Sequence, residues 1–285
     1  MIHNIAVIGL GTMGIGIVQA LAMGGKYIKM YSSSEKSIKK AHQTIETNLS
    51  QLVKAQRLST EQKECILSNL CPVYTLEEAC KNVELVIEAI PENLQLKKEM
   101  FKKIDRYTSA STILATNTSE LSVTAIASVT NRPDKVIGTH WFNPAHIMKL
   151  VEIIQGIETS EKTIQLVKEV VQSIGKESII VKDKQGFVTS RAIIIHLLEC
   201  IRMYDEGVCS KEDIDKAIKL GLNYPMGPLR LADYVGLDTI LFASQGLTEA
   251  WGDRFRAPQA LVKLVEAGHL GRKSGKGFYN YIRKS

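Results

Sequence analysis

The chain has 285 residues, of which 36 are Lys or Arg and 30 are Asp or Glu, so its formal net charge is +6. At roughly 100–200 residues per domain, this length predicts two domains. A charged fraction of 23% argues against disordered and fibrous proteins. The modest positive charge suits an anionic ligand better than a nucleic acid, and no apolar run approaches the ~20 residues that cross a bilayer.

No feature of the sequence points to export or to a metal site. Residues 1–4 contain no Lys or Arg before the first apolar run, which argues against a secretory signal peptide. The five cysteines include no CxxC pair and their number is odd, so they predict neither a disulfide framework nor a zinc site. We therefore expect a reduced, cytoplasmic protein without a bound metal.

In chain order, short apolar runs alternate with helical patterns over the first two thirds of the sequence. A long polar helical stretch is expected over residues 34–70, and helical spacing resumes between Pro91 and Tyr107. Strands are predicted at residues 5–8, 28–31, 85–89, 113–115, 136–140, 150–154 and 178–181. This alternation predicts parallel βαβ units and an α/β fold.

The pattern changes near residues 183–187, beyond which we find helical periodicity and almost no strand signal. The segment 192–203 is apolar on nearly every side, which is typical of a helix that is buried on most sides. We therefore expect a first domain over residues 1–184 and an all-α domain over residues 185–285.

A glycine-rich turn follows the first predicted strand and opens the first helical pattern. It has the form GxGxxG, in Gly9-Leu10-Gly11-Thr12-Met13-Gly14. In a dinucleotide-binding turn the first glycine permits the bend, the second lets the pyrophosphate approach the backbone, and the third allows close helix–strand packing. The helix N-terminus supplies donors to the phosphates. We therefore expect a Rossmann-type, NAD(P)-binding domain over residues 1–184.

The acid that usually follows the second strand of such a domain, about 20 residues on, is absent. This acid bonds the ribose 2′-hydroxyl of NAD and repels a 2′-phosphate. Here the strand ends at Tyr31 and Ser32, and Ser32 with Glu35 matches a helix capping box. NADP is therefore an alternative to NAD, and the nearby lysines are Lys36, Lys39 and Lys40, which otherwise form a solvated helix face.

Further segments, in order along the chain, carry a recognisable signature. They are EAIPEN (88–93), NTS (117–119), HWFNP (140–144), MKLVE (148–152), GFV (186–188), YPMGP (224–228), DYVGLD (233–238) and GRKSGKGFY (271–279). With the glycine turn, they make the chain resemble the L-3-hydroxyacyl-CoA dehydrogenase family, and within it the bacterial 3-hydroxybutyryl-CoA dehydrogenases. The resemblance covers nearly the whole chain, and the combination is specific although each segment alone is not.

The resemblance implies an NAD-binding Rossmann domain and an all-helical domain through which two chains form a homodimer. It implies oxidation of the 3-hydroxyl group of an acyl-CoA, a reaction of fatty acid and butanoate metabolism, with hydride transfer to the nicotinamide. His140 would be the catalytic base, Glu152 would orient it, and Ser119 would lie beside the reacting oxygen, in contact with substrate and cofactor. The family positions that contact the dinucleotide are Glu92, Lys97, Asn143 and Lys273.

His140 and Glu152 support the same chemistry without the resemblance. His140 lies at the C-terminal end of a predicted strand, where open α/β sheets place their ligands. A histidine can accept a hydroxyl proton near pH 7, and a carboxylate twelve residues on, in another strand, can fix its tautomer. The alternative for an isolated pair of this kind is a structural hydrogen bond, and the surrounding motifs favour the catalytic role.

Two departures from the family pattern concern the cofactor and the substrate. The ribose-binding Asp of the family is Ser32 here, and Ser190 stands where the family has a substrate-contacting Asn. Serine has a shorter reach and fewer donors than Asn. The phosphates of CoA are expected near residues 32–57, where five basic and two acidic residues leave a charge of +3; Asn48 and Lys54 are the expected contacts.

Two other functions remain open from the sequence. The first keeps the fold and the His–Glu pair but oxidises a small free hydroxy acid or carnitine, as relatives of the family do. The second is a non-catalytic protein that keeps the dinucleotide fold, as lens crystallins related to the family do. The joint presence of His140, Glu152 and Ser119 argues against the second.

Overall fold

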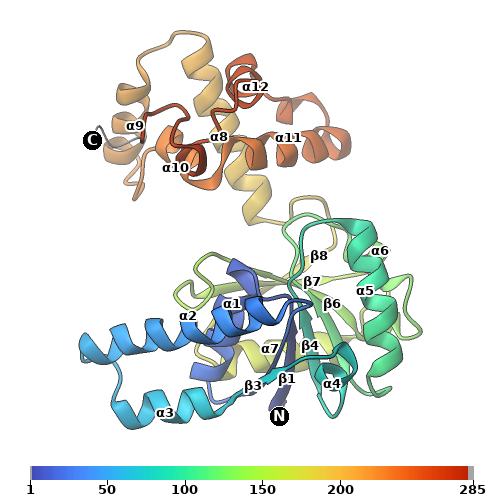
Figure 1. The fold of residues 1–285 in the computed structure, drawn as a ribbon. Helices are drawn as coiled ribbons and strands as arrows, with labels where there is room; N and C mark the ends of the chain where they lie inside the picture. Colours follow the sequence, from blue (N-terminus) through green and yellow to red (C-terminus); the bar gives the residue numbers. More distant parts are fainter. Residues whose placement is uncertain (1, 282–285) are drawn as a thin grey trace. The chain divides into compact units, whose positions relative to one another are not determined.

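The computed structural model describes residues 2–281, which fold into two compact units divided between Lys184 and Gln185 (Figure 1). The first unit is a β-sheet flanked by helices, and the second unit is made of helices. These observations confirm the expected fold class, in which an α/β domain is followed by a helical domain.

The sheet of the first unit has eight strands in the order β3-β2-β1-β4-β5-β6-β7-β8. Adjacent strands are parallel except for the antiparallel pair of β6 and β7. The strands are β1 (Asn4–Ile8), β2 (Tyr27–Tyr31), β3 (Leu70–Val73), β4 (Leu85–Glu88), β5 (Ile113–Thr116), β6 (Val136–Trp141), β7 (Leu150–Gln155) and β8 (Glu177–Lys182).

The expectation of parallel units throughout is therefore wrong at β7. Only a loop over residues 142–149 joins β6 to β7, and a parallel neighbour requires a crossover connection of a dozen residues or more. The strand β3 was not predicted either. It has four residues, includes Pro72 and lies at the sheet edge, where proline is tolerated.

The helices of the first unit correct a second expectation. They are α1 (Thr12–Met23), α2 (Glu35–Lys54), α3 (Thr60–Ser68), α4 (Leu76–Cys80), α5 (Leu94–Tyr107), α6 (Val123–Ala127) and α7 (Glu161–Ser173), with a 3₁₀ turn η1 at Pro133–Lys135. The continuous helix expected over residues 34–70 is two helices, because a capping box at Ser59 and Gln62 starts α3. The capping box expected at Ser32 is also wrong, since Ser34 caps α2 by accepting a hydrogen bond from the Ser37 N–H.

The second unit contains α8 (Thr189–Asp205), α9 (Lys211–Gly221), α10 (Pro228–Val235), α11 (Leu237–Trp251) and α12 (Gln259–Glu266), with 3₁₀ turns η2 (Asp253–Phe255) and η3 (Arg272–Ser274). The helix α8 buries one face, which includes Ile194, Leu197 and Ile201. Its other face is only partly covered within one chain, and Ile195 and Met203 lie there. The expectation that this helix is buried on most sides is therefore wrong for the single chain.

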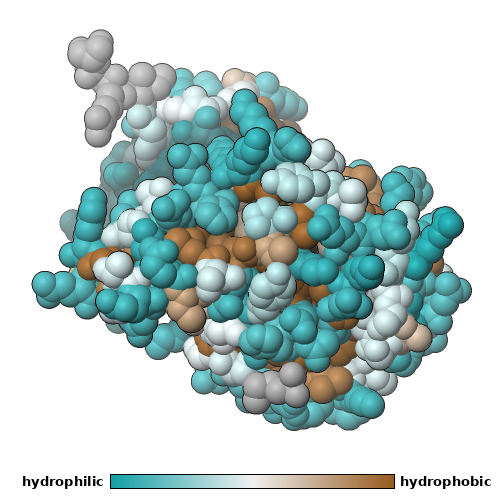
Figure 2. Space-filling view, turned by 60° about the horizontal axis from the view of Figure 1, so that its bottom comes forward, coloured by the Kyte–Doolittle hydropathy of each residue, from teal (hydrophilic) through white to brown (hydrophobic). Residues whose placement is uncertain are grey.

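The surface is mixed in polarity. Hydrophilic side chains cover most of the face in Figure 2, and hydrophobic side chains appear in patches between them. Within residues 2–281, no helix combines the length and the apolar character needed to cross a membrane. In the same residues, no group of three His, Cys, Asp or Glu side chains is arranged to hold a metal ion.

Candidate functional site

The glycine turn has the geometry that a dinucleotide requires. Gly9 follows β1 with φ +97°, and a Cβ atom there would lie 2.6 Å from the Ala89 carbonyl oxygen. A Cβ on Gly14 would lie 1.8 Å from the Gly9 carbonyl oxygen, so both positions require glycine. A Cβ on Gly11 would meet no atom within 4 Å, so this backbone faces open space. The chain therefore forms a tight turn in which the backbone at Gly11, at the N-terminus of α1, is accessible, and this arrangement suits a pyrophosphate.

The sheet brings Ser32 close to this turn. The Gly9 N–H donates to the Tyr31 carbonyl at 2.9 Å, so the residue after Tyr31 lies at the same sheet edge as the glycines. Glu35, the nearest acid in the sequence, is exposed at the start of α2 and lies 3.9 Å from Lys39. Ser32 therefore follows β2 directly at this edge, whereas Glu35 begins α2 three residues further on.

A cavity of about 460 Å³ adjoins the glycine turn. Its wall includes Gly11 and Thr12 at the start of α1, Lys40 and Asn48 on one face of α2, and the loop after β6. That loop contributes Asn143 and His146. The cavity thus combines accessible backbone with a basic side chain, which suits an anionic ligand.

The structure separates the two residues expected to contact the substrate on α2. Asn48 lines the cavity, and its side-chain amide donates to the Gln19 side chain at 2.9 Å. Lys54 is the last residue of α2 and does not line the cavity. Lys54 lies six residues beyond Asn48, which places it about 9 Å further along the helix axis.

His140 and Glu152 are direct cross-strand neighbours in the antiparallel pair of β6 and β7. The His140 Nδ1 and the Glu152 Oε2 are 2.6 Å apart, and the two residues are 6% and 0% exposed. The carboxylate accepts the Nδ1–H, which leaves the lone pair of the ring on Nε2. The pairing expected from the sequence is therefore present, and it is built by the strand reversal that the sequence pattern did not reveal.

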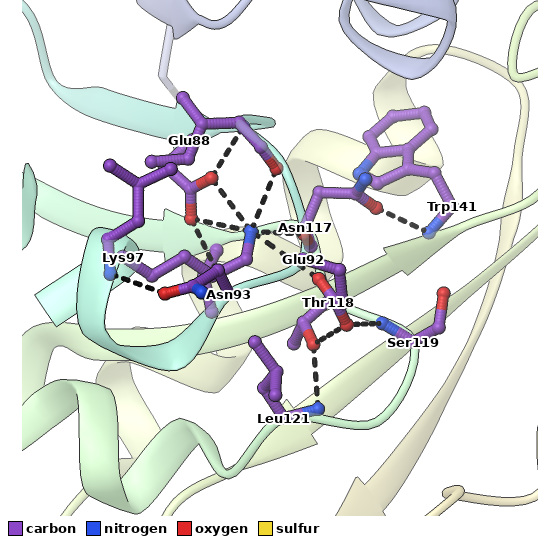
Figure 3. Close-up of polar contacts among 12 residues, drawn as sticks. Glu88, Glu92, Asn93, Lys97, Asn117, Thr118, Ser119, Leu121 and Trp141 are labelled. Atoms are coloured by element: carbon purple, nitrogen blue, oxygen red, sulfur yellow. Dashed lines mark hydrogen bonds and ion pairs between the residues drawn. The ribbon is translucent and has the colours of Figure 1, made fainter. Parts of the chain in front are cut away.

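Ser119 and Glu92 lie together at the ends of neighbouring strands. The Glu92 Oε1 accepts hydrogen bonds from the Ser119 N–H at 2.9 Å and from the Thr118 hydroxyl at 2.5 Å. In Figure 3 the Ser119 hydroxyl is turned away from Glu92. Glu92 therefore holds the backbone of Ser119 and leaves its hydroxyl to face elsewhere.

Lys97 lies deeper than a ligand contact usually does. Its side chain is 0% exposed, and its ammonium donates to Glu88, Ile90 and Asn117 (Figure 3). An ammonium has three N–H donors, so these acceptors occupy it within the protein. This arrangement differs from the direct contact with the dinucleotide that the family resemblance implies.

Two of the expected site residues belong to the second unit. Ser190 is the second residue of α8 and is partly buried. Lys273 lies in η3, where its ammonium pairs with Asp238 at 2.5 Å.

Sequence reasoning missed two titratable residues beside this site. Burial raises the pKa of the Glu120 carboxyl to about 7, and the negative charge of Glu92 adds to that rise. His146 has an Nδ1 that is buried without a hydrogen-bond partner, and burial together with Lys176 lowers its pKa. Both effects depend on burial in the folded chain, which no local sequence pattern signals.

Comparison with known proteins agrees with this geometry. Residues 4–184 match the family described as 3-hydroxyacyl-CoA dehydrogenase, NAD binding domain, and residues 186–281 match 3-hydroxyacyl-CoA dehydrogenase, C-terminal domain. A probable 3-hydroxybutyryl-CoA dehydrogenase of Bacillus subtilis is 44% identical over 100% of this chain and 99% of its own length. The 3-hydroxybutyryl-CoA dehydrogenase of Clostridioides difficile is 45% identical over 98% of this chain and 99% of its own.

A solved structure supports the same assignment. The (S)-3-hydroxybutyryl-CoA dehydrogenase of Ralstonia eutropha has a TM-score of 0.97 and 38% identity, over 99% of this chain and 100% of that one. Both matched families describe one kind of NAD-binding oxidoreductase, and together they cover nearly all of the sequence. The chain therefore belongs to the NAD-dependent 3-hydroxyacyl-CoA dehydrogenase family.

Proposed function

We propose that the chain interconverts a short-chain L-3-hydroxyacyl-CoA, such as 3-hydroxybutyryl-CoA, and its 3-oxoacyl-CoA, with His140 as the general acid–base. The observation that carries this proposal is the 2.6 Å contact between His140 and Glu152 at the C-terminal end of β6. The substrate class is supported by the relatives from Bacillus and Clostridioides, which are described as 3-hydroxybutyryl-CoA dehydrogenases.

In the direction of oxidation, the His140 Nε2 accepts the proton of the 3-hydroxyl group. The C–H bond at the same carbon breaks, and its electron pair and hydrogen leave as hydride, so a C=O bond forms. The nicotinamide supplies the hydride acceptor when NAD is bound. Glu152 stabilises the resulting imidazolium, as the acid of a catalytic triad does. The Ser119 hydroxyl donates to the reacting oxygen.

The cofactor is held by the glycine turn and by the loops at the same sheet edge. Gly11 and Thr12 bind the pyrophosphate, and Ser32 faces the adenine ribose. Because serine neither repels a 2′-phosphate nor bonds the ribose as strongly as aspartate, NADP is a second substrate beside NAD. Asn143 and Glu92 complete the part of the dinucleotide site that the first unit provides.

The CoA nucleotide binds along the start of α2. Lys40 and Asn48 line the cavity beside the glycine turn, which supports a phosphate contact there. The neighbouring basic residues, which raise the local positive potential, are Lys36, Lys39, Lys54 and Arg57. Their contribution is electrostatic and weakens with ionic strength.

The deciding experiment is the reduction of acetoacetyl-CoA, run in parallel with NADH and with NADPH. Free acetoacetate and 3-dehydrocarnitine serve as competing substrates of the same oxidation state. Turnover of acetoacetyl-CoA with a much higher kcat/KM than either competitor supports the proposal. Preference for a free acid would assign the site to small hydroxy acids, and tight NADH binding without turnover of any substrate would indicate a non-catalytic protein.

A further inference from the structure

The loop over residues 142–149 joins β6 to β7 and forms one wall of the cavity beside the glycine turn. Its wall residues include Asn143 and His146, which follow His140 by three and six positions. His146 is partly buried, and the proposed reaction does not use it. The cavity therefore contains a histidine whose role is still unassigned.

Close packing fixes this loop against α1. A Cβ atom on Gly16 would lie 3.1 Å from the Ala145 Cβ, so the helix and the loop are in close contact at this point. On the other side of His146, the Met148 carbonyl accepts a hydrogen bond from the buried Lys176 ammonium at 2.6 Å. These contacts hold His146 in the cavity wall before a ligand binds, which reduces the entropy lost on binding.

The two ring nitrogens of His146 have different surroundings. The Nδ1 is buried and has no hydrogen-bond partner within residues 2–281. Burial, and to a smaller extent the positive charge of Lys176, lowers the pKa of this ring, so near pH 7 the ring is neutral and carries one N–H. A hydrogen on Nδ1 would be buried without an acceptor, which is costly. The favoured form of His146 therefore offers an Nε2–H donor to the cavity.

This cavity lies beside the position expected for the dinucleotide. The dinucleotide is expected at the turn after β1 and at Ser32 after β2, and within residues 2–281 neither Gly9 nor Ser32 lines the cavity. The start of α1, at Gly11 and Thr12, borders both positions. The cavity, with a volume of about 460 Å³, therefore has room for a second ligand.

The wall of the cavity has two parts of different polarity. The part formed by α2 is polar and carries Lys40, Thr44 and Asn48. The part formed by α1 and the loop is mostly apolar, and its apolar residues are Leu10, Ile15, Pro144 and Ala145. An anionic nucleotide suits the polar part, whereas a chain of methylene groups interrupted by amides suits the apolar part that holds His146.

The order of these parts agrees with the order of groups in an acyl-CoA. In that substrate the thioester is followed by the pantetheine arm with its two amides, and then by the nucleotide with its phosphates. His146 lies six residues after His140, so their Cα atoms are at most about 20 Å apart. The loop turns between them, because the Ile147 N–H donates to the Pro144 carbonyl at 2.9 Å, and this shortens the distance. A group bound at His146 is therefore expected on the arm and not on the nucleotide.

We propose that His146 is a substrate-binding residue whose Nε2–H donates to an amide carbonyl oxygen of the pantetheine arm. This inference rests on the proposed function, because it takes the substrate to be an acyl-CoA. It also explains the unpartnered Nδ1, since a ring that presents Nε2 to the cavity has to bury its other nitrogen.

The test separates the donor from the ring. His146→Phe keeps an aromatic ring without an N–H, and His146→Gln keeps an N–H donor without the ring. The control is His42→Ala, which changes another partly buried histidine of the first unit, on α2 and outside the wall of this cavity. The readouts are kcat and KM with acetoacetyl-CoA and with acetoacetyl-pantetheine, which lacks the nucleotide, the Kd for CoA, pantetheine and NADH, and the Tm.

His146→Phe should raise the KM for both substrates by a similar factor of about three to ten, the usual contribution of one neutral hydrogen bond. The Kd for CoA and for pantetheine should rise by the same factor, whereas kcat and the Kd for NADH should change by less than about twofold. The Tm should not fall, because the substitution removes a buried nitrogen without a partner. His146→Gln should recover most of the loss in KM, and His42→Ala should leave KM and Kd unchanged.

An unchanged KM in His146→Phe would overturn the proposal. An equal loss in His146→Gln would indicate packing of the ring instead of a donated hydrogen bond. An effect on acetoacetyl-CoA alone would move the contact to the nucleotide, and a rise in the Kd for NADH would move it to the dinucleotide. If His146→Phe does not fold, His146→Ala is judged by the same criteria. A wild-type chain that binds CoA without reducing acetoacetyl-CoA contradicts the proposed function, whereas the Kd for CoA and pantetheine still decide the role of His146.

Discussion

At the scale of single residues, the proposed reaction depends on the proton that the His140 Nε2 accepts in oxidation and returns in reduction. We expect His140→Ala to lower kcat by roughly 10²–10⁴-fold, the usual contribution of a general acid–base. NADH binding, measured by fluorescence titration, should persist because the glycine turn is intact. His3→Ala removes an exposed histidine before β1 and serves as the control. Activity of His140→Ala above about a tenth of the wild-type value would remove His140 from this role.

Glu152 acts through the ring of His140, so its removal has a different signature. In Glu152→Gln the amide no longer stabilises an imidazolium, and we expect a lower kcat together with a shifted pH profile of kcat/KM. The measurement is the rate of acetoacetyl-CoA reduction across the neutral pH range. A lower kcat with an unchanged profile would make Glu152 a structural partner of the ring.

The carboxyl of Glu120 should make stability depend on pH. Its pKa is raised from the ordinary value of 4.5 to about 7, so between these values it stays protonated in the folded chain and ionises on unfolding. Stability should therefore fall as pH rises from about 4.5 to about 7 and then level off. Glu120→Gln removes this loss, so its Tm relative to wild type should be higher at pH 8 than at pH 5.

The control for this experiment is Glu249→Gln, which changes an exposed glutamate of α11. Its Tm relative to wild type should be the same at both pH values. An equal difference for Glu120→Gln at pH 5 and pH 8 would show that this carboxyl titrates normally in the folded chain.

Ser32 should decide how strongly the chain distinguishes its two cofactors. With serine at the ribose position, we expect both NADH and NADPH to be used. Ser32→Asp restores a bond to the ribose diol and repels the 2′-phosphate, so kcat/KM should move toward NADH by at least about tenfold, or ~1.4 kcal/mol. Ser33→Asp is the matched control. A wild-type preference for NADH of about a thousandfold that Ser32→Asp leaves unchanged would move the ribose contact to another residue.

The residues that sequence reasoning located are those whose roles are encoded by local motifs. The pairing of His140 with Glu152 and the glycine turn were both predicted, because each lies in a short, recognisable segment. The burial of Lys97 and the raised pKa of Glu120 were not predicted, because both depend on contacts that form only in the folded chain. The residue type alone does not distinguish a buried lysine from an exposed one.

At the scale of elements, the basic residues of α2 differ in their distance from the cavity beside the glycine turn. Lys40 lines the cavity beside the glycine turn, whereas Lys54 is the last residue of the same helix, about 21 Å further along its axis. We therefore expect Lys40→Ala to raise the KM for acetoacetyl-CoA by severalfold and Lys54→Ala to raise it less, since Lys54 lies farther from the cavity and salt screens its charge over that distance. The KM of wild type should also rise with salt concentration.

Equal effects of the two alanine substitutions would place the CoA phosphates outside this cavity. The sequence predicted a basic region but not the helix end at Lys54 within it, because it predicted one helix over residues 34–70. The break before Ser59 depends on a capping box, and the strand β3 depends on pairing with β2 at the sheet edge. The capping box is a local pattern that was not used in predicting this segment, whereas the strand has no strong local pattern.

At the scale of the whole molecule, composition and the change of pattern near residue 185 were sufficient to predict two units of different class. The strand β7 was predicted but its antiparallel direction was not, because strand direction depends on the connection and not on the strand itself. That reversal places Glu152 opposite His140. The reversal of β7, which the sequence patterns did not predict, therefore brings together His140 and Glu152, which they did identify.

The last prediction concerns assembly. The second unit leaves apolar side chains outside its core, including Leu222 at 60% exposed and Tyr224, whose ring centroid lies 5.0 Å from that of His196 on α8. Ile195 lies on the partly covered side of the same helix. Because apolar patches of this kind mark interaction surfaces, we propose a homodimer through the second unit. Light scattering at micromolar concentration should give twice the mass of one chain.

Ile195→Asp and Leu222→Asp should each shift this mass toward that of a monomer, because each places a charge in the proposed interface. Ile157→Asp is the matched control, since Ile157 is 84% exposed in the first unit and lies outside the proposed surface. Circular dichroism should show that all three variants remain folded. A monomeric wild-type chain would contradict the proposal, and dissociation by Ile157→Asp alone would move the interface to the first unit.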